Sequence, residues 1–171
     1  MRQFIIFLLF YFTSTLVNAQ IDEKVFYVDE TNDYRLLIDK TTKVHKQKLA
    51  DSRVETFVFT KDNQFKFTVT ISRSKAKNMT NDSLSTPNYE QAYVNNCGCE
   101  VLSIKQSGFT NVNSLQFKIK RVEKGKTLLG YTDSFVVNNV LFNIVFMTLE
   151  NTFPLYQKEY TGIMNTMIIN K

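Results

Sequence analysis

Residues 54–72 place the strongest constraint on the fold, because apolar and polar side chains alternate along this segment. The apolar positions are Phe65, Phe67, Val69 and Ile71, and the polar positions between them are Lys66, Thr68, Thr70 and Ser72. A period of two puts all the apolar side chains on one face of a β-strand. A second apolar run, residues 54–60, precedes the polar turn Lys61-Asp62-Asn63. The segment therefore predicts an antiparallel hairpin in a sheet that is packed on one face and solvated on the other.

Six further segments have the composition of strands. They are residues 25–28, 34–38, 101–106, 115–119, 128–137 and 140–149. Polar pairs suited to tight turns stand between several of them, at Asn32-Asp33, Lys124-Gly125 and Asn138-Asn139. The last strand, VLFNIVFMTL, is apolar on both faces except at Asn143. A strand of this kind is covered on both sides, so we expect it at the centre of the sheet.

Two segments have helical signals. Thr86 precedes Pro87 and predicts a capped helix that ends near Asn96, with Gly98 as its left-handed terminator. A second helix is expected after Thr152, which would cap it with Pro154 in the first turn, and a short edge strand is expected at residues 167–169. Its apolar side chains recur at helical spacing, at Phe153, Tyr156, Tyr160, Ile163, Met164 and Met167. Residues 39–52 and 72–86 are too polar to bury, and we expect exposed connections there.

This order of elements predicts an α+β fold: an antiparallel β-sheet with a helix from the middle of the chain and a C-terminal helix packed against it. From residue 101 onward the pattern resembles the second half of PsbP-like proteins, the family of the photosystem II extrinsic subunit. The matching feature is a strand, then "LLGYTDSFVVNNVLFNIVFMTLENTF", then a helix ending in "IMNTMII". The resemblance implies an α/β/α sandwich, shared with a Ran-binding nuclear import factor. It also implies binding of other proteins, and it transfers no catalytic residue.

The N-terminus has the layout of a secretory signal. Arg2 precedes an uncharged apolar run, residues 4–12, and Val17-Asn18-Ala19 has the small residues that signal peptidase reads. The run is shorter than the roughly 20 residues of a membrane-spanning helix. We therefore expect residues 1–19 to be a signal peptide cleaved after Ala19, and residues 20–171 to be a single α+β domain. The protein would then be periplasmic or secreted, without a transmembrane span; an uncleaved anchor is the alternative.

Cys97 and Cys99 are the only cysteines, and one glycine separates them. In an exported protein such a pair is expected to form a local disulfide. Intermolecular pairing, free thiols and a redox centre are the alternatives. Common redox motifs place two residues between their cysteines at the start of a helix, where the helix dipole lowers the thiol pKa. Here the pair follows a helix, which favours a structural disulfide.

Catalytic and metal-binding motifs are missing from the sequence. His45 is the single histidine, it stands among lysines that repel cations, and the five glycines form no phosphate-binding loop. No G-x-S-x-G elbow is present. We expect no catalytic residue, no metal and no cofactor, and a protein that is not an enzyme. Two thiolates can bind Cu(I) or supply two of the four ligands of a zinc ion, so metal binding by the CGC motif is an alternative.

Basic residues form the expected partner-binding surface. They are Lys43, His45 and Lys46 in one segment and Lys124 and Lys126 in another, in a chain of formal net charge +5. An exported protein rarely meets nucleic acid, so we expect another exported or envelope protein as the partner. The sequence thus predicts a non-catalytic binding or accessory protein. A secreted carrier of a small ligand is the alternative; it would have a cavity between helix and sheet, whereas a protein-binding module would have a filled core and an exposed apolar patch.

Overall fold

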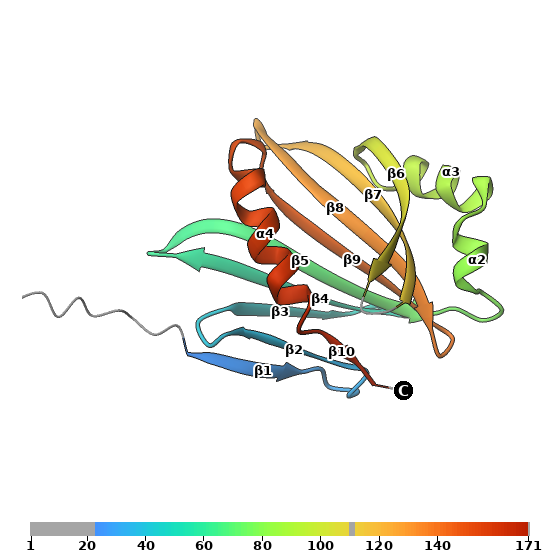
Figure 1. Cartoon of the computed structure of the whole chain (residues 1–171), viewed down its shortest axis with the longest axis horizontal. Helices are drawn as coiled ribbons and strands as arrows, with labels where there is room; N and C mark the ends of the chain where they lie inside the picture. Colours follow the sequence, from blue (N-terminus) through green and yellow to red (C-terminus); the bar gives the residue numbers. More distant parts are fainter. Residues whose placement is uncertain (1–22, 110–111, 171) are drawn as a thin grey trace, which may run out of the picture.

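The computed structural model describes residues 23–109 and 112–170, which form two antiparallel β-sheets and three α-helices. The larger sheet has seven strands in the order β3-β4-β5-β9-β8-β7-β6, and the smaller has three in the order β1-β2-β10 (Figure 1). The strands are β1 (Lys24–Val28), β2 (Tyr34–Asp39), β3 (Lys43–Lys48), β4 (Ser52–Lys61), β5 (Gln64–Lys75), β6 (Glu100–Phe109), β7 (Val112–Glu123), β8 (Lys126–Val137), β9 (Val140–Leu149) and β10 (Ile168–Ile169).

Two-residue turns close the hairpins β4–β5, β7–β8 and β8–β9. Both residues of each turn have positive φ: Asp62 and Asn63, Lys124 and Gly125, Asn138 and Asn139. Turns with two positive φ angles match the right-handed twist of the flanking strands, and Asn, Asp and Gly adopt them most readily. The predicted hairpins are therefore confirmed, together with their turn positions.

Strand β9 lies at the centre of the seven-stranded sheet, between β5 and β8, as its sequence predicts. Phe142, Ile144 and Phe146 are buried on one face of this strand. Val145 and Met147 point to the other face and pack against a second apolar cluster. Both faces of β9 are thus covered, which explains why its sequence does not alternate.

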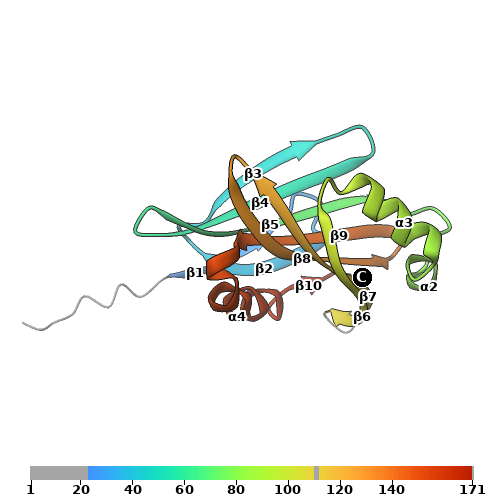
Figure 2. The same ribbon diagram turned by 90° about the horizontal axis from the view of Figure 1, so that it is seen from above.

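The two faces of the large sheet are covered by different elements. Helix α4 (Phe153–Met164), which follows the 3₁₀ turn η1 (Glu150–Thr152), packs on one face together with the three-stranded sheet. Helices α2 (Asn81–Leu84) and α3 (Pro87–Asn96) pack on the other face. Figure 2 shows α3 and α4 on opposite sides of the strands. This confirms the predicted α/β/α sandwich and adds a second sheet to one of its layers.

The two longer helices differ in whether a threonine side chain caps their first turn. The Thr86 hydroxyl accepts a hydrogen bond from the backbone N–H of Tyr89, and α3 ends at Asn96, just before Gly98 with φ of 59°. These features are as predicted. Thr152 precedes α4, but the predicted side-chain cap is wrong. The hydroxyl of Thr152 donates instead to the carbonyl oxygen of Leu149, 3.0 Å away.

Two predicted connections contain regular structure. Residues 39–52 include β3, an edge strand whose lysines face solvent, so the sequence shows no apolar alternation. Residues 72–86 include the end of β5 and all of α2. Ala76 and Leu84 are each 1% exposed, and these two apolar side chains anchor a segment that is otherwise polar. The prediction of irregular connections is therefore wrong for both segments, whereas the predicted exposure is wrong for residues 72–86 and confirmed for residues 39–52, which contain no buried residue.

No helix in residues 23–109 and 112–170 combines the length and the apolar character needed to cross a bilayer. The expected signal peptide, residues 1–19, lies outside the described residues.

Candidate functional site

Arg73, on β5, contacts three carboxylates, two of which lie in a turn of the three-stranded sheet and join it to the larger sheet. Its side chain is 4% exposed, and its Nη1 donates to a carboxylate oxygen of Asp29 at 2.5 Å and of Asp33 at 2.7 Å. Its Nη2 lies 3.4 Å from a carboxylate oxygen of Glu55, on β4. Asp29 and Asp33 belong to the turn between β1 and β2. We call Arg73, Asp29, Asp33 and Glu55 the Arg73 clamp.

Further hydrogen bonds hold the carboxylates of the clamp in place. Asp29 accepts from the backbone N–H groups of Thr31, at 2.8 Å, and Tyr34, at 2.9 Å. The hydroxyl groups of Tyr27, at 2.8 Å, and Tyr34 both donate to Glu55. The buried carboxylates of Asp29 and Glu55 are thus hydrogen-bonded from both sheets, which favours a single packing arrangement of the two sheets.

The surroundings of these groups fix their charges. Burial by itself raises the pKa of Asp29, but hydrogen bonds from Thr31, Tyr34 and Arg73 outweigh it and hold the pKa below its usual value. Burial lowers the pKa of Arg73, and the nearby Asp29 and Glu55 more than offset this effect. Burial, followed by the hydrogen bond to Glu55, raises the pKa of Tyr27 and Tyr34. At neutral pH the Arg73 clamp thus contains a charged arginine and an ionised Asp29, and the two tyrosines that bind Glu55 are neutral.

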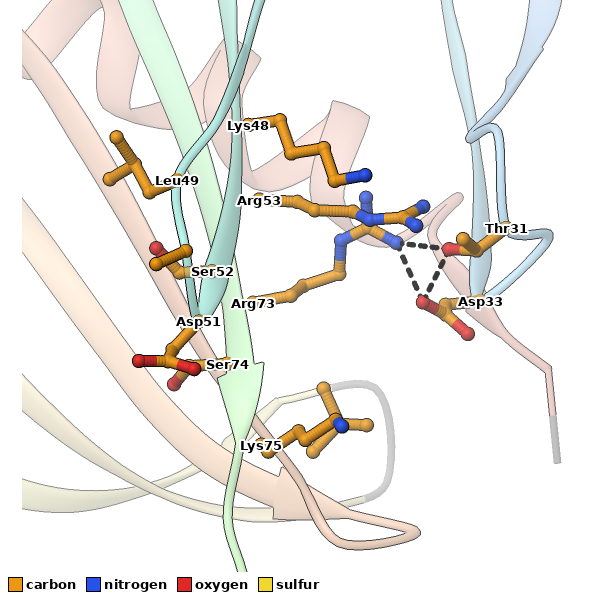
Figure 3. A pocket seen from close by; sticks show the side chains of 12 residues that line it. Thr31, Asp33, Lys48, Leu49, Asp51, Ser52, Arg53, Arg73, Ser74 and Lys75 are labelled. Atoms are coloured by element: carbon orange, nitrogen blue, oxygen red, sulfur yellow. Dashed lines mark hydrogen bonds and ion pairs between the residues drawn. The ribbon is translucent and has the colours of Figure 1, made fainter.

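A crevice of about 360 Å³ opens beside the clamp, where the β1–β2 turn faces the turn between β3 and β4. We call it the inter-sheet crevice; Lys48, Arg53 and Arg73 line it together with Thr31 and Asp33 (Figure 3). A second hollow of about 290 Å³ shares the three cationic residues. Sequence reasoning missed Arg73 because it lies in a segment expected to be a loop. Continuing the alternation of Phe65 to Ile71 by two residues would have placed Arg73 on the buried face.

The basic residues predicted from the sequence fall into two separate groups. Lys43, His45 and Lys46 lie on the edge strand β3, whereas Lys124 and Lys126 lie at the β7–β8 hairpin. Strands β4, β5 and β9 separate β3 from β8, so the structure does not bring the two groups together. Among residues 23–109 and 112–170, no three His, Cys, Asp or Glu side chains are grouped as metal ligands would be.

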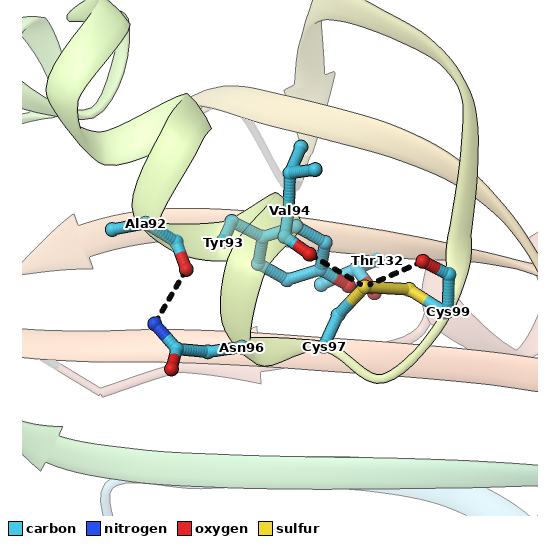
Figure 4. The surroundings of a disulfide bond; sticks show 7 residues. All are labelled: Ala92, Tyr93, Val94, Asn96, Cys97, Cys99 and Thr132. Atoms are coloured by element: carbon cyan, nitrogen blue, oxygen red, sulfur yellow. Dashed lines mark hydrogen bonds between the residues drawn. A yellow bond between two sulfur atoms is a disulfide. The ribbon is translucent and has the colours of Figure 1, made fainter.

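Cys97 and Cys99 are bonded to each other in the structure, at the C-terminal end of α3 (Figure 4). The ring of Tyr93 stacks on Phe117 with centroids 4.0 Å apart, and its hydroxyl lies 2.5 Å from that of Thr132. A groove of about 430 Å³ borders the disulfide on the open part of the sheet. Because Tyr93 attaches α3 to the sheet independently, the disulfide is one of two restraints on this helix end.

Replacing Cys97 and Cys99 together with serine is expected to lower the free energy of unfolding by about 1–3 kcal/mol at most, because the loop they close is short. Urea denaturation followed by circular dichroism measures the change. The wild-type protein with a reducing agent is the control, and it should match the double variant. An unfolded double variant would contradict this expectation.

The outer face of the three-stranded sheet is apolar. Tyr34, Leu36 and Ile38 point inward from β2 and are buried, so their neighbours point outward. Five of the outward side chains lie together, with Phe26, Val28, Leu37 and Ile168 around Arg35, and the charged pair Lys24 and Asp39 lies at one end of the same face. Phe26 is 57% exposed, Val28 48% and Ile168 41%. The guanidinium carbon of Arg35 lies 5.8 Å from the centre of the Phe26 ring. We call these five residues the outer β1–β2–β10 face.

No protein-family model matches the sequence, and no curated protein sequence matches it. Solved structures do resemble the fold. The cyanobacterial PsbP protein (CyanoP) of Synechocystis sp. PCC 6803 is similar with a TM-score of 0.63 and 10% identity, over 90% of this chain and 96% of that one.

Two further structures match with lower scores. PA94 of Pseudomonas aeruginosa, described as a putative regulator of unknown function, has a TM-score of 0.54 and 11% identity, over 87% of this chain and 99% of that one. A protein of Bacteroides thetaiotaomicron has a TM-score of 0.53 and 12% identity, over 88% of this chain and 50% of that one. Identities this low relate the folds alone. The two-sheet sandwich with α3 and α4 on opposite faces is thus a PsbP-like fold.

Proposed function

We propose that the protein is an exported, non-catalytic module that binds another exported or envelope protein through the outer β1–β2–β10 face. The observation that carries the proposal is an exposed apolar face beside a filled core. The surface of a soluble protein rarely exposes several large apolar side chains together unless they contact a partner. Aromatic and arginine side chains are also enriched among the residues that dominate binding energy, and Phe26 and Arg35 are adjacent here.

The packing between α4 and the large sheet supports this function over that of a carrier that holds a small ligand beneath this helix. A carrier needs an internal cavity, and the natural place for it is beneath α4. The rings of Phe146 and Tyr160 stack there with centroids 4.4 Å apart, and Phe153 lies 6.0 Å from Phe146. Phe153, Tyr160 and Met164 are each no more than 5% exposed. Aromatic side chains thus occupy the space that a carried ligand would need.

The test combines Phe26→Ser with Val28→Thr in the tagged protein expressed in its native cells. The matched control combines Leu155→Ser with Val122→Thr, at apolar positions that are 66% and 69% exposed and lie elsewhere on the surface. We expect the amount of the co-purified partner to fall at least tenfold in the first variant and to stay at the wild-type level in the control. Equal recovery of the partner by all three proteins would contradict the proposal.

A further inference from the structure

Three cationic side chains form one row across neighbouring strands. Lys48 on β3 is directly opposite Arg53 on β4, and Arg53 is directly opposite Arg73 on β5. Like charges placed directly opposite each other destabilise an antiparallel pair. The row therefore has an energetic cost in the free protein, and an anion bound beside it would remove this cost.

Carboxylates neutralise only one end of this row. Arg73 forms ion pairs with Asp29, Asp33 and Glu55. In the next row of the sheet, Lys46 pairs with Glu30 at 3.0 Å. Within the part of the chain that the structure describes, Lys48 and Arg53 have no carboxylate within 4.0 Å. Their charges are therefore available to a ligand.

Arg73 itself retains one unused hydrogen-bond donor. Its Nε is buried and has no partner among the described residues, although both terminal nitrogens of the same guanidinium are engaged. A buried donor without a partner costs free energy, and such donors occur where a ligand or water completes the site. Arg73 lines the inter-sheet crevice, so the guanidinium that carries this donor borders the crevice.

The inter-sheet crevice has the room and the lining for a small anion. Figure 3 shows Lys48 and Arg53 extending beside Arg73 toward the β1–β2 turn. Lys75 is a fourth cationic residue of the lining, and Thr31 contributes a hydroxyl group. The side chains of Ser52 and Ser74 point to the opposite face of the sheet from Arg53 and Arg73. Two carboxylates also line the crevice: Asp33 is paired with Arg73, and Asp51 is exposed at the turn between β3 and β4. The cationic side chains thus outnumber the anionic ones.

We propose that the inter-sheet crevice binds a phosphate-type oxyanion, either free phosphate or the phosphate of an anionic lipid headgroup. Arg53 would donate through its planar guanidinium, a geometry that matches phosphate oxygens, and Lys48 would contribute a compact positive charge. Arg73 stays paired with Asp29, Asp33 and Glu55, and its positive charge would help to orient the bound oxyanion. This site is separate from the outer β1–β2–β10 face and does not depend on the function proposed for that face.

The test measures binding of inorganic phosphate by ¹⁵N NMR titration at constant ionic strength, with sodium chloride as the reference salt. The site variant combines Lys48→Gln with Arg53→Gln, and the matched control combines Lys124→Gln with Lys126→Gln, so both lose the same charge. We expect saturable shifts at residues 48–53 and 73–75 in the wild type. The site variant should bind at least tenfold more weakly, and the control should stay within about twofold of the wild type.

Thermal unfolding separates binding from a structural role. Without phosphate, the site variant should unfold at the wild-type temperature or higher, because the repulsion between Lys48 and Arg53, neither of which is paired with a carboxylate among the described residues, is removed. Phosphate should raise the unfolding temperature of the wild type and of the control, but not that of the site variant.

Vesicles of phosphatidylglycerol and of phosphatidylcholine then identify the source of the phosphate group. Binding to phosphatidylglycerol vesicles alone indicates a lipid headgroup, and binding to neither kind of vesicle indicates free phosphate. No saturable phosphate binding, or equal loss in both variants, would overturn the proposal.

Discussion

Replacement of Arg73 with methionine is expected to lower the free energy of unfolding by about 3–5 kcal/mol, because removing one partner of a buried ion pair leaves uncompensated charge. Asp29 and Glu55 are 3% and 4% exposed, so water cannot take over the role of the guanidinium. Methionine preserves most of the side-chain volume, and the effect therefore reports on charge rather than on a cavity.

The pH dependence of this variant tests the mechanism. In the wild type, the lowered pKa of Asp29 stabilises the fold above the unfolded-state pKa of about 3.8, and this contribution is lost as the pH falls. Without Arg73 the contribution disappears, so the two proteins should differ less at pH 3, below the unfolded-state pKa, than at pH 7. Urea denaturation at both pH values measures the difference, and a penalty that stays constant with pH would contradict this account of the clamp.

A compensated variant separates loss of charge balance from loss of fold. Arg73→Met combined with Asp29→Asn and Glu55→Gln removes the unpaired charges together with the arginine. Replacing a whole buried ionic cluster with neutral groups is often tolerated, so we expect this variant to recover part of the lost stability. No recovery in the triple variant would indicate that the hydrogen-bond geometry, rather than charge balance, is decisive.

Replacement of Asp133 with asparagine is expected to raise the free energy of unfolding at pH 7.5 by about 2–3 kcal/mol. Asp133 is 1% exposed on β8, where it accepts hydrogen bonds from Gln116 at 2.8 Å and from Tyr160 at 3.3 Å. Burial raises the pKa of its carboxyl from 3.8 to about 6, although both hydrogen bonds oppose the increase. The ionised carboxylate is therefore a cost to the folded state at neutral pH.

The sign of this effect follows from proton binding. Between about pH 4 and pH 6 the folded protein holds a proton on Asp133 that the unfolded chain releases, so stability falls as the pH rises through this window. The asparagine variant should lack this decrease and should equal the wild type near pH 4. Its side chain can still accept one hydrogen bond and donate another. Urea denaturation from pH 4 to 7.5 tests this, with Glu123→Gln as an exposed control, and lower stability of the variant at pH 7.5 would contradict it.

The sequence was informative where structure depends on neighbouring residues. The hairpin turns at Asp62-Asn63, Lys124-Gly125 and Asn138-Asn139 follow from local chemistry, because Asn, Asp and Gly, which adopt positive φ readily, supply all of these turn residues except Lys124. The alternation from Phe67 to Ile71 and the apolar character of residues 140–149 likewise predicted the burial and position of their strands, whereas Phe65, at the start of β5, is 42% exposed and its predicted burial is wrong. The turn residues and the apolar patterns can each be recognised within a stretch of about ten residues.

Features that depend on distant pairing could not be predicted in this way. The three-stranded sheet forms because Ile168 and Ile169 pair with Arg35 and Tyr34, far apart in the sequence. The inter-sheet crevice depends on the register that places Lys48, Arg53 and Arg73 in one row. Strand β3 was missed because an exposed edge strand buries too few side chains to alternate. The predicted basic surface, in turn, was assembled from sequence clusters that the sheet order keeps apart.

Site-specific photocrosslinking in native cells tests the proposed binding face most directly. A benzophenone amino acid would replace Phe26 on the outer β1–β2–β10 face in one protein and Leu155 on α4 in another, both of which have exposed side chains. We expect irradiation to give one dominant crosslinked protein from position 26 and none from position 155. The same crosslinked protein from position 155, or no crosslink from position 26, would contradict the conclusion that the three-stranded sheet is the binding surface.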